Sequence, residues 1–436
     1  MRRTAMVGLL IGTVTAGALF GQTDATVHRL SLSEALARAV EVNNSVERAR
    51  AEISAADASR RQVLSSVLPR FTASGSTVRN SNEVAFGGDG DEQTVIARND
   101  WNYRLVLSQP VFAGRREFRA YSQARIGVES AQLAESGTTD AVLLLVASNY
   151  LAMLNAGARI ELERRNVELA EKRRHQAKAF FEAGEVTKVD ILRAETAIKA
   201  ALRGVALAEQ TRENAASRLR ADLDLDGSIV AATPVDVLPP LPDEATLVQR
   251  GTETRPDVRV AENDVRIASL EVQKQRGFWW PVITFDGGWI NQKAQFPSPQ
   301  YSYGALRFTV PILQSGEVEA RVAQAKHREL QARLSAEEAR TEAREDVRRA
   351  LADLRAIETS LRLAQEQVTA AEAEYNQAFE LYRAQEATSL DVAISETSLA
   401  DARRSVAEET LNYQIAQLRV WYAAGAMREV AAKVTP

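Results

Sequence analysis

The sequence contains no cysteine and only three histidines among its 436 residues. The missing cysteines exclude disulfides, thiolate metal sites and cysteine nucleophiles. His28, His175 and His327 lie too far apart in sequence for a histidine metal site, so we expect surface or packing roles for them. The sequence also has no phosphate loop, nucleophile elbow or HExxH motif. We therefore predict no enzymatic activity, no metal and no cofactor.

No charge of one sign dominates the chain. Lys and Arg number 54 and Asp and Glu number 58, which gives a formal net charge of -4, and the two signs are mixed along the sequence. A nucleic-acid-binding protein concentrates its basic residues in a patch or stripe. No nucleic-acid partner is therefore predicted.

Long hydrophobic runs are missing after the N-terminus. Residues 5–20 form an apolar run behind two arginines and are followed by small and polar residues, which is typical of a secretory signal that we place at 1–23. A membrane anchor is the alternative, but this run is short for a bilayer span. No later segment approaches 18 uninterrupted apolar residues. A part of the mature chain that enters a membrane must therefore enter as β-strands.

Internal repetition organises the rest of the chain. Two pairs of prolines stand in similar contexts, Pro69 with Pro281 at a separation of 212 residues and Pro110 with Pro311 at a separation of 201. The same offset of 201 superposes residues 183–191 on 384–392, so the first copy carries 11 extra residues between its prolines. We predict a signal peptide at 1–23, a first repeat at 24–228, a linker at 229–242, a second repeat at 243–425 and a tail at 426–436.

Each repeat is predicted to run through a helix, two strands, a long helix, a tight turn and a second long helix. Residues 31–66 and 243–278 have helical composition and end where a proline opens the strand pair. Gly and Pro are absent between Gly316 and the turn at 384–388, so a helix there would be about 100 Å long. Apolar residues recur at every seventh position on both sides of that turn, which predicts an antiparallel coiled coil. These residues are Val347, Leu354, Leu361, Val368, Tyr375 and Tyr382, then Val392, Leu399, Val406, Tyr413 and Val420.

Between the paired prolines the hydrophobic period changes to two, which predicts β-hairpins at about 69–112 and 281–313. Trp101, Tyr103, Leu105 and Leu107 alternate with mainly polar residues, and aromatic residues gather near the strand ends as in the girdles of membrane barrels. A soluble hairpin packed on one face is the alternative. The Gly- and Asp-rich stretch 87–92 is interpreted as a solvated loop rather than a calcium site.

Four strands cannot close a barrel, and open strand edges in lipid leave backbone groups unpaired. Two copies would supply eight strands, whose interior is filled by side chains, whereas three copies would supply twelve and leave a water-filled lumen. A homotrimer is therefore the smallest conducting assembly that we expect.

The tandem repeat, the paired prolines and the turns around Gly184, Asp190 and Asp391 resemble the TolC-type outer-membrane efflux family over residues 28–425. The resemblance implies a mainly α fold with four β-strands per chain. It implies a homotrimer with a 12-stranded transmembrane β-barrel in outer-membrane lipid and a periplasmic α-helical tunnel.

This resemblance implies a passive outer-membrane export channel that works with a periplasmic adaptor and an inner-membrane pump. Small-molecule efflux and type I protein secretion share this architecture. A periplasmic coiled-coil adaptor and a structural protein are the alternatives from other classes, and the adaptor would leave the alternating strands unexplained.

The same resemblance places function at the two helical turns, 183–187 and 384–388. It implies that both turns contact the adaptor. The candidate contact residues are Gly184, Glu185, Thr187, Gln385, Glu386 and Thr388. Asp391 matches a family aspartate that narrows the tunnel entrance, Tyr382 matches a tyrosine that helps to close it, and Asp190 is the equivalent of Asp391 in the first repeat.

The sequence departs from this pattern because Ile394 replaces a second aspartate, Ala387 replaces an arginine and Gln385 replaces the turn glycine. Thr187 with Asp190, and Thr388 with Asp391, also fit capping boxes, which is a structural role. A single ring of three Asp391 carboxylates would still attract cations.

Overall fold

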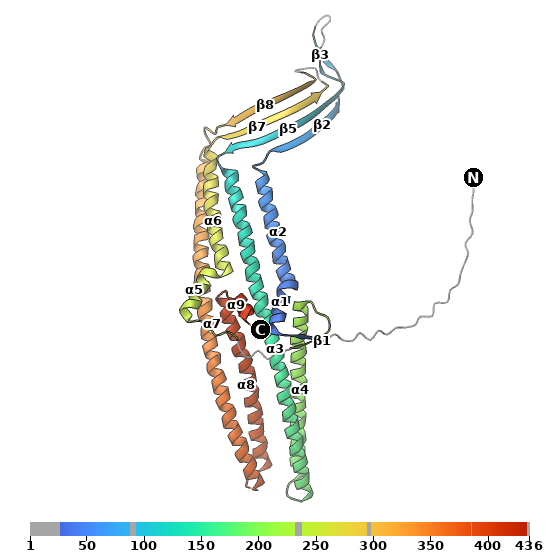
Figure 1. Cartoon of the computed structure of the whole chain (residues 1–436), viewed down its shortest axis with the longest axis vertical. Coiled ribbons are helices and arrows are strands. Elements are labelled where there is room, and N and C mark those ends of the chain that lie inside the picture. Colours follow the sequence, from blue (N-terminus) through green and yellow to red (C-terminus); the bar gives the residue numbers. More distant parts are fainter. Residues whose placement is uncertain (1–26, 88–92, 232–237, 294–297, 385, 434–436) are drawn as a thin grey trace, which may run out of the picture.

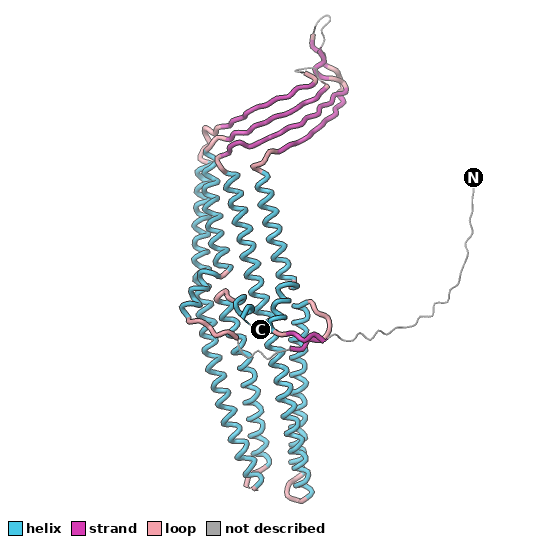
Figure 2. Tube along the Cα trace, viewed as in Figure 1, coloured by secondary structure: helices cyan, strands magenta, loops and turns pink. Residues whose placement is uncertain are grey.

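The computed structural model describes residues 27–87, 93–231, 238–293, 298–384 and 386–433. This part of the chain is elongated, with a β-sheet at one end and long helices that run away from it (Figures 1 and 2). The first half contains β1 (Val27–Leu30), α1 (Leu32–Val42), α2 (Asn44–Ser65), β2 (Arg70–Arg79), β3 (Val84–Phe86), β4 (Gln93–Ile96), β5 (Asn99–Ala113), α3 (Arg116–Glu182) and α4 (Lys188–Leu223). The second half contains β6 (Ser228–Ala231), α5 (Glu244–Thr254), α6 (Pro256–Arg276), the 3-10 turn η1 (Gly277–Trp279), β7 (Val282–Gln292), β8 (Gln300–Thr309), α7 (Glu317–Arg383), α8 (Ser389–Ala423) and α9 (Met427–Lys433).

Helices α3 and α7 are the longest elements, with 67 residues each. The bounds of α7 lie 201 residues after those of α3, and α8 begins 201 residues after α4. Each long helix packs antiparallel against its successor, α3 with α4 and α7 with α8 (Figure 1). Buried side chains include several of the apolar residues that recur at every seventh position, namely Val347, Leu354, Val392, Leu399 and Val420. The long hairpins predicted from the heptad spacing are therefore present.

The prediction of one helix before each strand pair was wrong, because two helices stand at each place. Asn43 has extended backbone angles and its side-chain oxygen accepts a hydrogen bond from the amide of Ser45, so it ends α1 and caps α2. Pro256 is the first residue of α6 and biases Arg255 away from helical angles. Asn43 and Pro256 are residue types that commonly end or begin a helix, but the helical composition on both sides of each favoured a single continuous helix.

The four long strands form one antiparallel sheet in the order β2-β5-β7-β8. Strands β5 and β7, which come from the two halves of the chain, pair at the centre and leave β2 and β8 at the edges. The first hairpin also carries a short ribbon of β3 and β4 that projects beyond the sheet (Figure 1). This ribbon accounts for part of the extra length of the first hairpin, whereas residues 88–92 lie outside the described residues, as do 1–23 and Gln385.

The main hydrophobic core lies beside the middle of α3, where α1, the C-terminal ends of α4 and α8, and α9 meet. Its fully buried side chains include Tyr150, Leu219, Leu418 and Trp421. A segment of α3 is long and apolar enough to cross a membrane by length and composition, but half of that segment is buried within the fold. We therefore assign its apolarity to core packing.

Three small elements beside this core were not predicted. Strands β1 and β6 pair in parallel, and β6 occupies the start of the predicted linker. The predicted C-terminal tail contains α9, whose Met427 and Val430 are buried in the core. Short strands and helices of this kind lack the periodicity that identifies longer elements.

Candidate functional site

The sheet has one apolar and one polar face. Residues directly opposite each other in an antiparallel pair share a face, so the strand registers assign every side chain. The apolar face carries Phe71, Ala73, Trp101, Tyr103, Leu105, Leu107, Ile283, Phe285, Trp289, Leu306 and Phe308. Phe71, Leu306 and Phe308 are 67%, 66% and 73% exposed, which is far more apolar surface than a solvated sheet normally leaves uncovered.

The opposite face of the sheet is mainly polar. It carries Thr72, Ser74, Ser76, Asn102, Arg104, Ser108, Asp286, Gln292 and Arg307. Ser108 donates a hydrogen bond of 2.8 Å to Asp286, and Arg307 lies 3.7 Å from the other oxygen of that carboxylate. The separation of apolar and polar side chains predicted from the two-residue period is thus maintained across all four strands.

Aromatic and basic side chains gather where the sheet joins the helices. The Trp280 ring packs edge-on against Phe112, at 6.2 Å between centroids, and the guanidinium groups of Arg116 and Arg321 lie 4.2 and 4.9 Å from the ring of Phe278. Gly114 has a positive φ of 64°, and a Cβ there would lie 2.1 Å from the carbonyl oxygen of Gly277. This contact therefore fixes the two strand-to-helix junctions against each other.

The two helical turns lie at the far end of the molecule from the sheet (Figure 1). Both predicted capping boxes are present: the Asp190 carboxylate accepts from the amide and hydroxyl of Thr187, and Asp391 accepts from the same groups of Thr388. Gly184 closes the first turn at a φ of 80°, where a glycine avoids strain. Glu185 and Glu386 are exposed beside them, as are both threonines.

Local contacts shift the pKa values of the three predicted gate residues. Burial acts to raise the pKa of Asp190, but hydrogen bonds from Ser389 and Thr187 outweigh it and lower that pKa. Hydrogen bonds from Thr388 hold the pKa of Asp391 below its usual range. Burial raises the pKa of Tyr382, and the nearby Asp190 carboxylate adds to the shift. Both aspartates are therefore anionic and Tyr382 is neutral at neutral pH.

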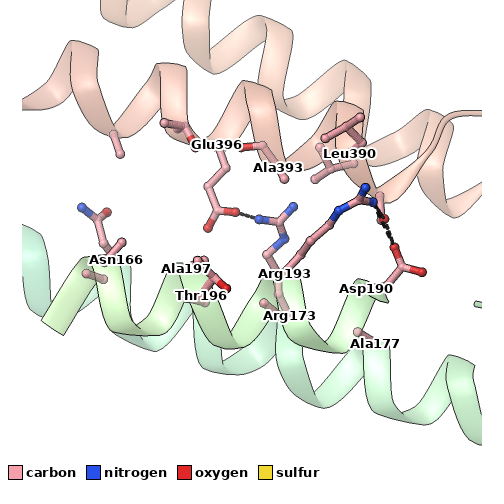
Figure 3. A pocket seen from close by; sticks show the side chains of 18 of the residues that line it. Asn166, Arg173, Ala177, Asp190, Arg193, Thr196, Ala197, Leu390, Ala393 and Glu396 are labelled. Carbon is pink, nitrogen blue, oxygen red and sulfur yellow. Dashed lines mark hydrogen bonds and ion pairs between the residues drawn. The ribbon is translucent and has the colours of Figure 1, made fainter. Parts of the chain in front are cut away.

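The α3–α4 hairpin contacts the α7–α8 hairpin through polar pairs near this end. Arg173 forms an ion pair with Glu396, both 15% exposed, and Arg404 contacts the buried Glu163 at 2.7 Å. The Ser389 hydroxyl donates to Asp190. Figure 3 shows Arg173 and Glu396 reaching toward each other across the space between the hairpins, with Asp190 beside them, and a cavity of about 520 Å³ lies there.

The structure brings only some of the predicted site residues together. Asp190 and Tyr382 both line the cavity, whereas Asp391 is exposed and does not. The Tyr382 ring packs edge-on against the Phe180 ring, at 6.2 Å between centroids. The candidate turn residues stay at the surface, and Gln385 lies outside the described residues.

Sequence reasoning missed the ion pairs between the hairpins. Glu163 is 1% exposed and stands in a stripe of small residues at every seventh position, with Ala156, Ala170 and Ala177. Gly204 on α4 leaves room for its carboxyl group, because a Cβ there would lie 2.7 Å from that group. The sequence signal that could have identified this ion pair was a single glutamate among alanines at heptad spacing.

Comparisons with known proteins agree with this architecture. The family described as "Outer membrane efflux protein" matches residues 33–223 and 247–426, one segment in each half of the chain. "Nodulation protein T" of Rhizobium leguminosarum bv. viciae is 24% identical over 328 residues, which cover 70% of this chain and 63% of that protein. The chain thus spans less than two thirds of this relative's length.

Solved structures of membrane channels share the fold. CusC, whose structures are described in terms of transmembrane channel formation, superposes with a TM-score of 0.79 over 90% of this chain and 92% of its own, at 18% identity. The Campylobacter jejuni CmeC outer membrane channel superposes with a TM-score of 0.73 over 96% of this chain and 94% of its own, also at 18% identity. At 18% identity, this structural similarity establishes the fold alone. Because the family match covers most of both halves, the chain belongs to the outer membrane efflux protein family.

Proposed function

We propose that the chain is the outer-membrane channel of an export system, assembled as a homotrimer from tandem repeats. Three four-stranded sheets close a twelve-stranded barrel in the outer membrane, and the helices continue it as a periplasmic tunnel. The channel is passive: an inner-membrane pump supplies the energy and a periplasmic adaptor binds at the helical turns. Its cargo is small molecules.

The observation that carries this proposal is a sheet with an apolar face and two unpaired edges, β2 and β8. Such a sheet is stable in lipid only when its edges are paired, because each unsatisfied backbone group costs several kcal/mol there. Copies of the same chain provide complementary edges: β8 of one subunit pairs with β2 of the next, and the ring closes after three. A soluble adaptor would have no use for this surface.

The repeat in the sequence defines the register in which β8 of one subunit pairs with β2 of the next. The pairing of β5 with β7 transfers to β8 with β2 through the offsets of 201 and 212, so Thr309 takes the place of Ser108 and Ser74 the place of Asp286. The same transfer sets Leu313 against Phe71, in the manner of Phe112 against Ile283. This accounts for the 85% exposure of Leu313 in the single chain.

Cysteine cross-linking tests this joint without background, because the chain has no native cysteine. Ser74→Cys combined with Thr309→Cys is expected to give covalent dimers and trimers after treatment with a short thiol cross-linker. Within one chain these residues lie on opposite edges of the sheet, three strand spacings apart across it and eight residues apart along it, because Tyr301 is the residue of β8 that is level with Ser74. The separation is about 30 Å at the usual strand dimensions, so the bond must join subunits. Ser74→Cys with Tyr301→Cys is the matched control, because Tyr301 lies eight residues along the same strand.

The readout is a denaturing gel of membranes and of purified protein. Bands of cross-linked dimers and trimers from the Ser74→Cys/Thr309→Cys variant, with no such bands from the Ser74→Cys/Tyr301→Cys control, support the closed ring. A purified chain that stays monomeric and water-soluble without detergent, or one that cross-links only in the control pair, would overturn the proposed function.

A further inference from the structure

The polar face of the sheet carries more positive than negative charge. The strand registers assign Arg70, Arg104 and Arg307 to this face, and Asp100 and Asp286 with them. In the trimer of the proposed function, on which this inference rests, this face lines the water-filled lumen of the barrel, because the apolar face lies against lipid. The lumen wall is therefore basic, although the whole chain has a formal net charge of -4.

Two of these arginines keep N–H groups available. The Nε of Arg104 donates a hydrogen bond of 2.7 Å to the side-chain oxygen of Asn102, and among the described residues no carboxylate pairs with Arg104. Arg307 lies 3.7 Å from Asp286, which is an ion pair but longer than a hydrogen bond. Asp100 lies four residues from Arg104 on the same strand, about 13 Å away, and one of its oxygens is buried in the wall.

The pairing of β8 from one subunit with β2 from the next brings these two arginines near each other. Within the second subunit, Arg104 lies opposite Ser74. The proposed register sets Thr309 of the first subunit against this serine. By the same offsets of 201 and 212, it sets Arg307 of the first subunit against Ser76 of the second. Arg104 and Arg307 then lie two strands and two residues apart, about 12 Å between their backbones.

Short hydroxyl side chains cover the wall between the two guanidinium groups. Ser74, Ser76 and Thr309 leave open the space above them, into which both long side chains can reach. Guanidinium groups bind carboxylate and phosphate groups through paired hydrogen bonds, and hydroxyls supply further donors. The equivalent place within one chain has Val106 and Ala305 instead of the arginines, so only the contact between two subunits creates this arrangement.

We propose that each contact between β8 and β2 of neighbouring subunits forms an anion-binding site in the barrel lumen. Arg307 of one subunit and Arg104 of the next hold a carboxylate or phosphate group above Ser74 and Ser76. The three sites of a closed trimer concentrate small anionic molecules at the end of the export path, and thereby favour anionic cargo. The Asp391 carboxylates at the opposite end attract cations, so the two ends act in opposite senses.

Recordings of conducting full-length channels in planar lipid bilayers test the site. In a potassium chloride gradient, Arg104→Gln and Arg307→Gln are each expected to shift the reversal potential toward the potassium equilibrium potential, and the double variant to shift it further. Citrate on the barrel side is expected to reduce the native current, and each variant to need several-fold more citrate for the same reduction. Both effects should weaken at high salt, because screening shortens the range of the charges.

Two variants serve as matched controls. Arg79→Gln makes the same substitution at an exposed arginine on the other face of the sheet, and is expected to leave both measurements at the native level. Arg104→Lys keeps the charge without the planar guanidinium group, so it is expected to keep the reversal potential and to weaken citrate inhibition.

The outcomes separate the site from the channel itself. A native reversal potential and native citrate inhibition in the Arg104→Gln/Arg307→Gln double variant would overturn the site. A shifted reversal potential with unchanged citrate inhibition would overturn it as well, because the charges would then act without binding. A protein that forms no cross-link between Ser74→Cys and Thr309→Cys and no conducting channel would instead overturn the proposed function.

Discussion

At the residue scale, Asp391 combines a cap with a charge. Its carboxylate accepts hydrogen bonds from the Thr388 amide and hydroxyl, which alone would explain an aspartate at this position. Three copies at a tunnel entrance would also attract cations. Substitutions that separate these roles are therefore informative.

We expect Asp391→Asn and Asp391→Ala both to reduce cation selectivity, measured as the reversal potential of open channels in a salt gradient. Asparagine keeps an acceptor at this N3 position of the capping box, whereas alanine removes it and costs the helix about 1 kcal/mol. Only Asp391→Ala should therefore lower the thermal stability as well. A native reversal potential in Asp391→Asn would leave the residue with a capping role alone.

Sequence reasoning reached the residues at the turns and missed those between the hairpins. Thr187 with Asp190 and Thr388 with Asp391 were identified because a capping box is a local pattern of fixed spacing. The contact of Arg404 with Glu163 joins positions 241 residues apart, and its existence depends on how two coiled coils pack. A long-range pair of this kind leaves no local pattern.

At the element scale, the long hairpins and the four-stranded sheet follow from periodicity. Heptad spacing and two-residue alternation extend over enough residues to identify α3, α4, α7, α8 and the strands. The ribbon of β3 and β4, the parallel pair of β1 and β6, and α9 are too short to carry a period. The breaks at Asn43 and Pro256 depend on single residues, which sequence composition averages out.

The junction between the sheet and the helices depends on Gly114. We expect Gly114→Ala to lower the yield of heat-resistant trimers, because its Cβ would lie 2.1 Å from the Gly277 carbonyl oxygen and its φ of 64° strains any other residue. Gly127→Ala in α3 is the control, since nothing lies within 4 Å of a Cβ there and alanine favours the helix. Equal trimer yields from both variants would contradict a fixed junction.

At the scale of the whole molecule, the two faces of the sheet should respond differently to charge. Leu306 lies on the apolar face near the middle of β8, and its neighbour Ala305 lies on the polar face. Leu306→Lys places a charge against lipid at a cost of about 2–4 kcal/mol per subunit, whereas Ala305→Lys points into water.

Leu306→Lys is therefore expected to reduce the amount of trimer in outer-membrane fractions, and Ala305→Lys to leave it near the native level. Quantitative blotting of unheated samples measures the difference. The reverse order of yields would mean that the faces are assigned the wrong way round.

Within the part of the chain that the structure describes, the ribbon of β3 and β4 lies in the first hairpin and has no counterpart in the second. A closed trimer would thus show three of these projections to the surroundings of the cell, while its barrel and tunnel approach sixfold symmetry. An antibody or bacteriophage that recognises the exposed Phe86 and its neighbours would find three epitopes per channel. Such a reagent would count assembled channels on intact cells without entering the export path.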